Sequence, residues 1–273
     1  MTASPQVVAP PGACDTHMHV YDSRVPALPG TPMPGDFRVE AYRRVQRRLG
    51  LARVVVVQPN AYGYDNGVTV AAMRDLGAGA RGVAVVRSNA PDAEIESLTA
   101  AGIRAVRVMA LGGTIGFDAM DAVVARVHPF GWHANIQLDG RELPEREAQI
   151  ARLPGRFVID HTGKFLEPVD VGSAPFAALL RLVDTGRCWV KLSAPYETSR
   201  TGPPLYEDVA RLARALVRAA PERMLWASNW PHPSARGAVP DDADLLDLLL
   251  DWAPDDATRG RILVDNPAEL YGF

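Results

Sequence analysis

Two short motifs at opposite ends of the chain hold most of the residues that could do chemistry. Asp15-Thr-His-Met-His19 ends a short apolar run near the N-terminus. Leu225-Trp-Ala-Ser-Asn-Trp-Pro-His-Pro233 is typical of a buried strand that runs into a loop interrupted by proline. His17 and His19 point the same way, because side chains alternate along a strand with a period of two. The motifs predict one site, built from the first and last strands of a closed barrel.

Asn229 is the most informative position, because the motif around it calls for an aspartate. A carboxylate there would be the general base or a metal ligand of a hydrolase, whereas a neutral amide is neither a base nor a good ligand. The sequence therefore predicts a reaction that does not use a base at this position. Asp15, on the face of the two histidines, either orients one of them or is a buried structural carboxylate.

A third group of candidates lies in the second half of the chain. His161 follows the run Phe157–Asp160 at the end of a sixth strand, so three of the six histidines lie at strand ends. Lys164 is either a carboxylate binder or a solvated surface lysine. Lys191 lies within a seventh strand, where unpaired burial is costly. It is either a site residue or a salt-bridged core residue, and the structural role is favoured.

Elements able to position these residues alternate along the whole chain. Strands are expected to end near His17, Gln58, Val86, Met109, Leu138, Asp160, Leu192 and Ser228. Apolar positions at helical spacing predict helices over 36–49, 93–101, 120–127, 142–153, 176–185, 206–219 and 242–252. Glycines fall where helices should stop, at Gly50, Gly102, Gly131, Gly155 and Gly186. Eight strand–helix units imply an α/β fold, a (β/α)8 TIM barrel with residues 1–273 as a single domain.

Three irregular segments follow expected strands and should lie on the C-terminal face, where barrels keep their chemistry. Segments 23–35 and 198–204 are either substrate-covering loops or simple connections. The glycine-rich segment 112–116 lacks the spacing of a dinucleotide-binding loop and is expected to lie flexibly over the pocket.

Composition limits the partners and the compartment. A net charge of -3 gives no basic field, which argues against nucleic acid and anionic membranes as partners. No apolar run reaches the roughly 18 residues of a membrane span, and the N-terminus lacks the features of a signal peptide. Cys14 and Cys188 lie in apolar runs and argue against a disulfide framework. We expect a cytoplasmic protein, and the sequence says nothing of its oligomeric state.

The three motifs together resemble those of the amidohydrolase superfamily. They are more similar to its 2-pyrone-4,6-dicarboxylate lactonase branch, and most similar to the D-galactarolactone isomerases. The resemblance covers nearly the whole chain and implies a (β/α)8 barrel that acts on lactones of dicarboxylic acids without a metal. By position it implies that His17, His19 and His161 are active-site histidines and that Arg107 binds a substrate carboxylate. Asn229 replaces the aspartate that activates water in the lactonases, so here the chain agrees with the isomerases.

Other positions also depart from the lactonase pattern. The fifth strand has Gln137 where the lactonases have a tyrosine, and Tyr196, Glu197 and Arg200 stand in place of a lactonase arginine after the seventh strand. A smaller, more hydroxylated substrate than a planar pyrone would suit these changes. The residues expected to bind an anionic lactone are therefore Arg107, Gln58, Gln137, Lys164, Tyr196 and Arg200.

A metal centre would be incomplete in this chain. The first-strand pair and His161 are present, but the eighth-strand carboxylate is missing and the fifth strand does not end in histidine. His133 lies at the start of that strand, on the wrong face. Three neutral imidazoles can hold Zn²⁺, so the residues alone leave a metal open. We expect neither a metal nor another cofactor.

The asparagine favours one reaction over another. A general base contributes about 10²–10⁴-fold to water attack. A well-oriented hydroxyl of the substrate itself has an effective molarity of about 10⁵–10⁸ M. Intramolecular acyl transfer, from the 1,5-lactone to the 1,4-lactone of an aldaric acid, therefore tolerates Asn229. Two alternatives stay open: a lactone hydrolase, with a histidine as base or with its aspartate deliberately replaced, and a non-catalytic barrel that binds sugar acids.

Overall fold

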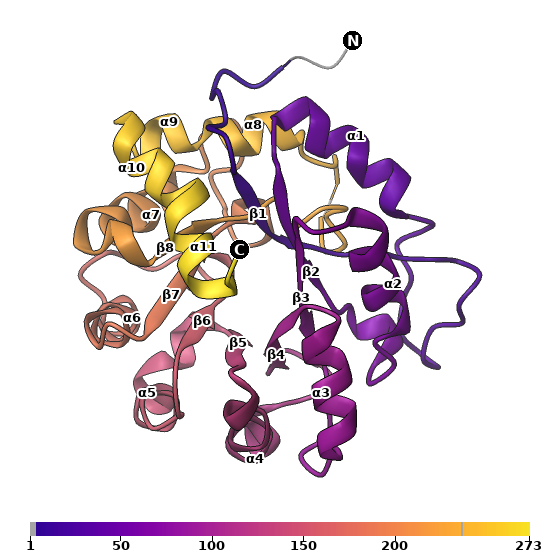
Figure 1. The fold of residues 1–273 in the computed structure, drawn as a ribbon. Coiled ribbons are helices and arrows are strands. Elements are labelled where there is room, and N and C mark those ends of the chain that lie inside the picture. Colours follow the sequence, from indigo (N-terminus) through magenta and orange to yellow (C-terminus); the bar gives the residue numbers. More distant parts are fainter. Residues whose placement is uncertain (1–3, 236) are drawn as a thin grey trace.

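The computed structural model of the protein describes residues 4–235 and 237–273. Its centre is one sheet of eight parallel strands in sequential order (Figure 1). The strands are β1 (Cys14–Met18), β2 (Arg53–Val57), β3 (Ala80–Ala84), β4 (Ile103–Met109), β5 (His133–Gln137), β6 (Phe157–Ile159), β7 (Cys188–Leu192) and β8 (Met224–Trp226). Their side chains are almost entirely buried, as expected of parallel strands covered by helices. The predicted (β/α)8 fold is confirmed.

The first and last strands meet and bring the two terminal motifs together. Met18 forms a parallel bridge with Trp230. The backbone N–H of Asn229 donates to the carbonyl of His17 at 2.9 Å, and that of His19 donates to the carbonyl of Trp230 at 2.8 Å. Residues about 210 positions apart in the sequence therefore share one end of the barrel, as the motifs predict.

Helices surround the barrel, as Figure 1 shows. The longer ones are α1 (Val39–Leu49), α2 (Gly67–Leu76), α3 (Asp92–Ala100), α4 (Phe117–Val127), α5 (Leu143–Ala151), α6 (Ala174–Asp184) and α7 (Glu207–Ala219). Shorter ones follow β8: α8 (Asp242–Asp247), α9 (Leu249–Trp252), α10 (Asp256–Gly260) and α11 (Asn266–Tyr271). The sequence analysis missed α2, whose Gly and β-branched residues are poor helix formers, and the two C-terminal helices.

Among the glycines expected where helices stop, Gly50 caps its helix directly. Gly50 ends α1 in the left-handed region at φ 70°, and its N–H donates to the carbonyl of Arg47. A side chain would be strained there, so glycine is favoured. The other glycines of this set also have positive φ, namely Gly102, Gly131, Gly155 and Gly186.

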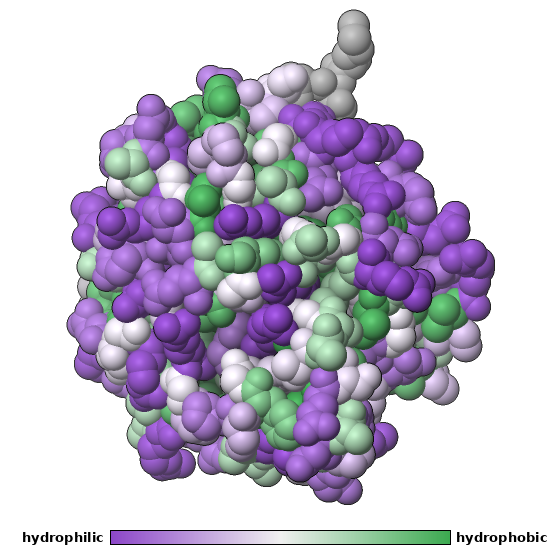
Figure 2. Space-filling model, in the orientation of Figure 1, coloured by the Kyte–Doolittle hydropathy of each residue, from purple (hydrophilic) through white to green (hydrophobic). Residues whose placement is uncertain are grey.

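The N-terminal end of the barrel is closed by the end of the chain. Figure 1 views this end, with α11 and the C-terminus in front of the strands. The rings of Tyr271 and His133 lie 5.1 Å apart, and the guanidinium of Arg81 lies 4.8 Å above the ring of Phe273. His133 therefore lies at the opposite end from His19, as predicted. Figure 2 shows this face as mostly hydrophilic, with small apolar areas between charged residues.

Two expectations about the chain as a whole can be compared with the structure. Cys14 and Cys188 are both free and buried, which confirms that they do not form a disulfide. Burial raises the pKa of the Cys188 thiol. Within residues 4–235 and 237–273, none of the helices is both long and apolar enough to cross a lipid bilayer.

Candidate active site

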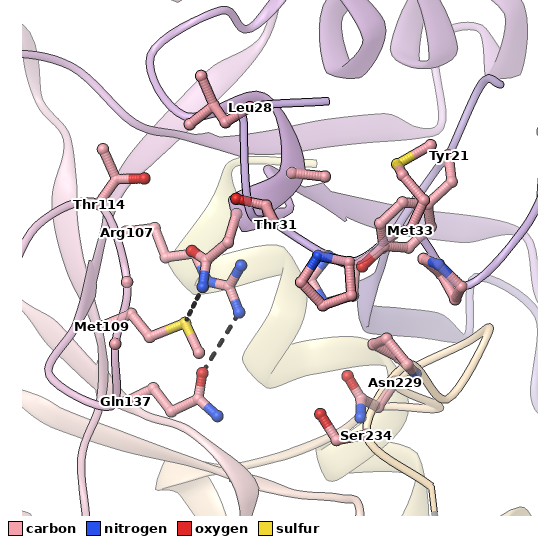
Figure 3. Close-up of a pocket in the computed structure, with 18 of the residues that line it drawn as sticks. Tyr21, Leu28, Thr31, Met33, Arg107, Met109, Thr114, Gln137, Asn229 and Ser234 are labelled. Atoms are coloured by element: carbon pink, nitrogen blue, oxygen red, sulfur yellow. Dashed lines mark hydrogen bonds between the residues drawn. The ribbon is translucent and has the colours of Figure 1, made fainter. Parts of the chain in front are cut away.

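A cavity of about 550 Å³ opens at the C-terminal end of the barrel (Figure 3). Its walls include loop residues of 28–34 and 112–114, so these two predicted loops do line the pocket. The segment 198–204 does not contribute to this lining. The polar groups that reach the cavity from the strand ends are His19, Arg107, Gln137, His161, Glu197 and Asn229.

One wall of the cavity carries a buried cation. The Arg107 guanidinium donates to the carbonyl of Gln58 at 2.6 Å and to Oε1 of Gln137 at 3.3 Å. Its Nε has no hydrogen-bond partner, and no carboxylate of the described residues forms an ion pair with it. Burial lowers the pKa of Arg107. The side chain lines the cavity. A buried guanidinium without a counter-ion suits an anionic ligand, since such a charge is costly unless paired.

The Gln58 side chain, predicted to bind substrate, makes its hydrogen bonds within the protein and does not line the cavity. Its Nε2 donates to the carbonyls of Gly63 and Asp65, and its Oε1 accepts from the Thr69 hydroxyl. The side-chain amide of Gln58 therefore stabilises the loop after β2. Only the backbone carbonyl of Gln58 contacts Arg107. Gln137, by contrast, lines the cavity beside Arg107, as Figure 3 shows.

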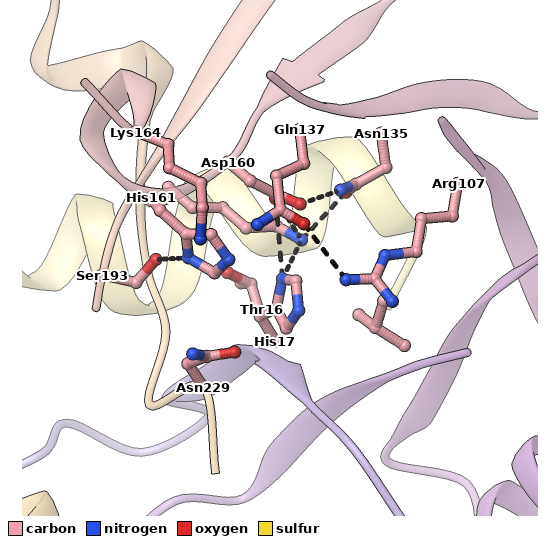
Figure 4. Close-up of polar contacts among 12 residues, drawn as sticks. Thr16, His17, Arg107, Asn135, Gln137, Asp160, His161, Lys164, Ser193 and Asn229 are labelled. Carbon is pink, nitrogen blue, oxygen red and sulfur yellow. Dashed lines mark hydrogen bonds and ion pairs between the residues drawn. The ribbon is translucent and has the colours of Figure 1, made fainter. Parts of the chain in front are cut away.

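Beneath the cavity floor lies a fully buried polar cluster centred on Lys191. Its Nζ lies 2.8 Å from Oδ1 of Asn135, 3.2 Å from Nδ1 of His17 and 3.2 Å from Oδ1 of Asp160. An ammonium has three protons, and three acceptors surround it. Asn135 in turn donates from Nδ2 to the second oxygen of Asp160 at 2.8 Å. Figure 4 shows Asn135, Asp160 and His17 of this network close together. Lys191 is both a core ion-pair partner and a neighbour of the site.

Burial and charge fix the ionisation of this cluster. Burial alone would raise the pKa of Asp160, but the charge of Lys191 and the contact with His17 hold it well below its usual range. Burial, together with the charge of Lys191, holds the pKa of His17 well below its usual value. His17 is therefore neutral while Asp160 is ionised.

The hydrogen-bond partners also decide which nitrogens carry protons. Nδ1 of His19 lies 2.7 Å from the carbonyl oxygen of Val57, which only accepts, so Nδ1 carries the proton. Nε2 of His19 is then an acceptor, and Nε2 of His17, at 3.1 Å, must donate to it. If Nδ1 of His17 instead carried the proton and donated to Asp160, 3.5 Å away, Nε2 of His17 would be unprotonated. Two nitrogen lone pairs, on Nε2 of His17 and Nε2 of His19, would then face each other. The chain of donors runs from Lys191 through both histidines to Val57.

His161 reaches the cavity directly, whereas His17 does not. Nδ1 of His161 lies 2.9 Å from the hydroxyl of Ser193, and burial lowers its pKa to about 4. His161 and His19 line the cavity, but His17 is completely buried and does not. Of the three histidines predicted to act on the substrate, His19 and His161 therefore line the cavity, and His17 lies behind them.

Asn229 is held so that its oxygen faces the cavity. Its Nδ2 donates both protons, to the hydroxyl of Tyr196 at 2.9 Å and to Oε1 of Glu197 at 3.1 Å. The side-chain oxygen is left to accept a hydrogen bond from a ligand (Figure 3). The backbone of Asn229 is left-handed at φ 59°, a conformation that asparagine tolerates better than most residues.

Tyr196 is itself oriented from behind. Its hydroxyl lies 3.0 Å from Nδ1 of His232, and Nε2 of His232 lies 3.1 Å from Oδ1 of Asp242. The Tyr196 hydroxyl thus lies between His232 and Asn229, and its oxygen accepts from Nδ2 of Asn229. Tyr196, predicted to bind substrate, contacts Asn229 and holds its side chain in place.

Glu197 is the functional residue that the sequence analysis left without a role. It lines the cavity, and its side chain is only 5% exposed. One oxygen accepts from Asn229 and the other forms a close ion pair with Lys164. Burial would raise the pKa of Glu197, but His161 and Lys164 lower it below its usual value, so the carboxylate is ionised. Lys164 is a buried carboxylate binder, but its partner belongs to the protein.

Two other residues singled out in the sequence have their partners within the protein. The Arg200 side chain is 69% exposed and pairs with Glu167 outside the cavity, so it does not lie with the other predicted binding residues. Asp15 is a structural carboxylate that accepts from the hydroxyls of Ser228 and Tyr42 and from the N–H of His17. Burial raises its pKa to about 6.

The donor set does not fit a divalent metal ion. Donor atoms of His17, Asp160 and His161 lie within 4.8 Å of one another. However, the Lys191 ammonium contacts both His17 and Asp160, so a cation would have to displace another cation. The remaining position, at the end of β8, offers the neutral amide of Asn229, a weak ligand.

The chain is similar to known proteins both in sequence and in fold. A family model described as amidohydrolase matches residues 14–273. The chain is 41% identical to a D-galactarolactone isomerase of Agrobacterium fabrum, covering 98% of this chain and 94% of that protein. It is 35% identical to a 2-pyrone-4,6-dicarbaxylate hydrolase of Comamonas testosteroni, covering 98% and 93%. A crystal structure of an Agrobacterium tumefaciens protein superimposes with a TM-score of 0.94 at 40% identity, covering 100% of this chain and 98% of that one.

Proposed function

The chain belongs to the amidohydrolase family, and we propose from that premise that it is a lactone isomerase. Its reaction converts the 1,5-lactone of an aldaric acid into the 1,4-lactone by intramolecular acyl transfer. The 41% identity to a D-galactarolactone isomerase supports this class of substrate. The alternative of a barrel that only binds sugar acids is disfavoured by a pocket whose ionisable groups are all held in defined states.

The orientation of Asn229 is the observation that carries the proposal. Its Nδ2 is committed to Tyr196 and Glu197, so its oxygen is the atom offered to the ligand. That oxygen can hold a substrate hydroxyl but cannot deprotonate water. A hydroxyl of the substrate is already attached to the lactone, and its high effective molarity favours it over water as the attacking group.

Arg107 supports a substrate with a free carboxylate. An aldaric acid lactone keeps one carboxylate outside the ring. Arg107 lines the cavity, and Nη1 and Nη2 each have a second N–H beyond the ones given to Gln58 and Gln137. Gln137, 3.3 Å from Arg107, is placed to bind the same end of the substrate. The lactone carbonyl then lies at the opposite side, near His161 and Asn229.

The bond changes consume no water. The substrate hydroxyl forms a new C–O bond to the lactone carbonyl carbon, and the ring C–O bond breaks when the tetrahedral intermediate collapses. His161, with Ser193 donating to its Nδ1, presents its Nε2–H to the developing oxyanion. His19 is held in place by His17, and Lys191 keeps His17 in the tautomer that makes this possible.

A lactone hydrolase is the second candidate, and a specific observation favours it. Glu197 places an ionised carboxylate in the cavity, and a carboxylate can activate water. The relative from Comamonas testosteroni is named as a hydrolase. The two reactions differ in whether the product ring is migrated or opened.

The proposal includes catalysis without a metal and a cytoplasmic location. The misfit of the donor set supports the first, and the two free cysteines support the second. Activity is expected to survive exhaustive chelation, with well under one equivalent of metal bound. Stoichiometric zinc whose removal abolishes turnover would contradict the metal-independent mechanism.

The function is tested by following a purified aldaric acid 1,5-lactone by NMR. Isomerisation gives the 1,4-lactone as the first product, faster than the uncatalysed rearrangement. An open-chain diacid as the first product would replace the isomerase proposal with the hydrolase. No acceleration of either reaction would contradict both the isomerase and the hydrolase proposals for this substrate.

A further inference from the structure

We infer that Glu197 is the catalytic residue that carries the proton between the two substrate oxygens during lactone migration. This inference rests on the proposed isomerase function and extends it. The carboxylate missing from the end of β8 is supplied from the loop after β7, and it reaches the same place. Oε1 of Glu197 lies 3.1 Å from the side chain that occupies the β8 position.

The reaction needs such a group, because the attacking hydroxyl must lose a proton and the leaving ring oxygen must gain one. Glu197 takes the proton from the attacking O–H as the new C–O bond forms. It returns the same proton to the ring oxygen as the old C–O bond breaks. No net proton or water is exchanged, and the carboxylate ends as it began.

The other polar groups near the cavity are less suited to take a proton. The lone pair on Nε2 of His19 is occupied by His17, and Nδ1 of His19 donates to Val57. The hydroxyl of Tyr21 lines the cavity and that of Tyr196 lies behind Asn229; burial raises the pKa of Tyr21 to about 12 and that of Tyr196 well above its usual value. Arg107 is a cation and has no basic lone pair.

His161 is the remaining competitor, and its environment disfavours the role. Burial lowers its pKa to about 4, and Ser193 occupies one of its nitrogens. Its other nitrogen is placed to donate to the oxyanion, a role for which a neutral imidazole is suited. Glu197 is the anion of the cavity wall, and each of its oxygens keeps a lone pair after binding Asn229 and Lys164.

The pairing also explains why position 229 is an amide. An aspartate there would face Glu197 across about 3 Å, and two carboxylates at this distance cannot both ionise. The asparagine instead donates to Glu197 and keeps it ionised. The amide and the carboxylate are thus one unit, with the carboxylate on the β7 side and the amide on the β8 side.

The direct test is Glu197→Gln, assayed for isomerisation of the 1,5-lactone by NMR. Loss of proton transfer should lower kcat by about 10²–10⁴-fold with little change in KM. Because this variant strands the Lys164 cation, the neutral double variant Glu197→Gln/Lys164→Met is measured beside it. Both should lose kcat alike. A kcat within threefold of wild type in a folded variant, or a loss confined to KM, would overturn the inference.

A second test distinguishes proton transfer from a structural role. Glu197→Gly leaves space for a small carboxylate, and added formate, fluoroacetate or acetate should restore turnover. The restored rate should rise with the pKa of the added acid, since general base catalysis follows Brønsted behaviour. Restoration that does not depend on the basicity of the added acid would indicate that Glu197 only neutralises Lys164.

The third test exchanges the two groups. Asn229→Asp alone should perform poorly, because it sets two carboxylates against each other. Adding Glu197→Gln restores one carboxylate and one amide in contact, now with the base on β8, and hydrolysis should rise relative to ring migration. The wild-type assay keeps the two claims separate: wild type that opens the ring refutes the isomerase, whereas wild type that isomerises with an unaffected Glu197→Gln variant refutes only the role of Glu197.

Discussion

Two polar groups meet at the C-terminal end of this barrel, and they are built differently. The floor layer, comprising His17, His19, Asn135, Asp160 and Lys191, comes from residues within or at the ends of strands. The wall unit, comprising Lys164, Tyr196, Glu197 and Asn229, comes from loops after β6, β7 and β8. The floor layer has a satisfied partner for nearly every polar atom. The wall unit keeps a free amide oxygen and carboxylate lone pairs toward the cavity.

This difference indicates that the floor layer maintains the structure of the site and that the wall unit takes part in the reaction. In the floor layer, the ion pair between Lys191 and Asp160 is buried away from water. The contact of Lys191 with His17 sets the tautomers of His17 and His19. The wall unit stands where a ligand can reach it, and its backbone is left-handed at Lys164 and Asn229. Such conformations cost energy and are found where function requires them. Disturbing the floor should therefore damage stability first, and disturbing the wall should damage turnover first.

The largest effect is expected from Lys191→Met. It leaves Asp160 ionised and buried without its cation, and removing one partner of a buried pair costs about 3–5 kcal/mol. Urea denaturation measures the loss. The double variant Lys191→Met/Asp160→Asn should recover much of the stability but not the activity, because His17 still lacks its donor. A single variant within 1 kcal/mol of wild type would mean that the pair does not hold the floor layer together.

Acid should weaken the same layer without any mutation. The folded-state pKa values of His17, His19, His133 and His161 all lie below the ordinary histidine value of 6.5. Their stabilising contribution is therefore present above that pH and lost as the pH falls through it. Asp15, whose pKa is raised to about 6, works in the opposite direction.

Four histidines against one aspartate give a net uptake of about three protons on unfolding near pH 5. The free energy of unfolding, measured by urea titration at pH 7, 6 and 5, should fall steeply across this range. Equal stability at pH 7 and pH 5 would mean that these histidines are not buried in their neutral form.

Arg107 belongs to neither group, and its variants test whether the opposite wall only binds. Arg107→Met should raise KM by about 10–100-fold for a carboxylated lactone, which corresponds to a hydrogen bond to a charged group. An uncharged lactone should be affected little, and Arg107→Lys should restore binding only in part because a bidentate contact is lost. Equal losses on both lactones would remove Arg107 from the substrate-binding residues.

The smallest effect is expected from Tyr196→Phe within the wall unit. It removes one of the two acceptors of Asn229 Nδ2 but leaves Glu197 in place. The loss of one hydrogen bond should lower kcat by about 3- to 10-fold, without a change in unfolding free energy beyond about 1 kcal/mol. A loss as large as that of Glu197→Gln would mean that the position of the amide, not the carboxylate, limits the rate.

The sequence predicts the strand residues of the floor layer better than the loop residues of the wall unit. The strand residues were accessible, because a period of two and the ends of apolar runs place His17, His19 and His161 at one end of the barrel. Arg107 was indicated by the family resemblance. The partnership of Lys191 with Asp160 was only half predicted, since the pairing depends on the register between β6 and β7.

The roles of loop residues were harder to predict, because a loop has no sequence periodicity that indicates which side chains point into the cavity. Glu197 and Arg200 are three positions apart, yet one lines the cavity and the other pairs with Glu167 outside it. Gln58 ends a strand as expected but spends its amide on the following loop. A carboxylate close in sequence to Tyr196 was the available signal for Glu197. The contact between Glu197 and Asn229, which only the structure shows, is what identifies Glu197 as a candidate site residue.

The central claim, intramolecular acyl transfer, is tested most directly by turnover in H₂¹⁸O. The enzyme is mixed with an aldaric acid 1,5-lactone, and the first-formed 1,4-lactone is analysed by mass spectrometry. Because the attacking oxygen is the substrate's own, the product should carry no ¹⁸O above that of a control without enzyme. Incorporation of one ¹⁸O into the product carboxyl group, or release of labelled open-chain diacid, would show that water attacks and would contradict the account.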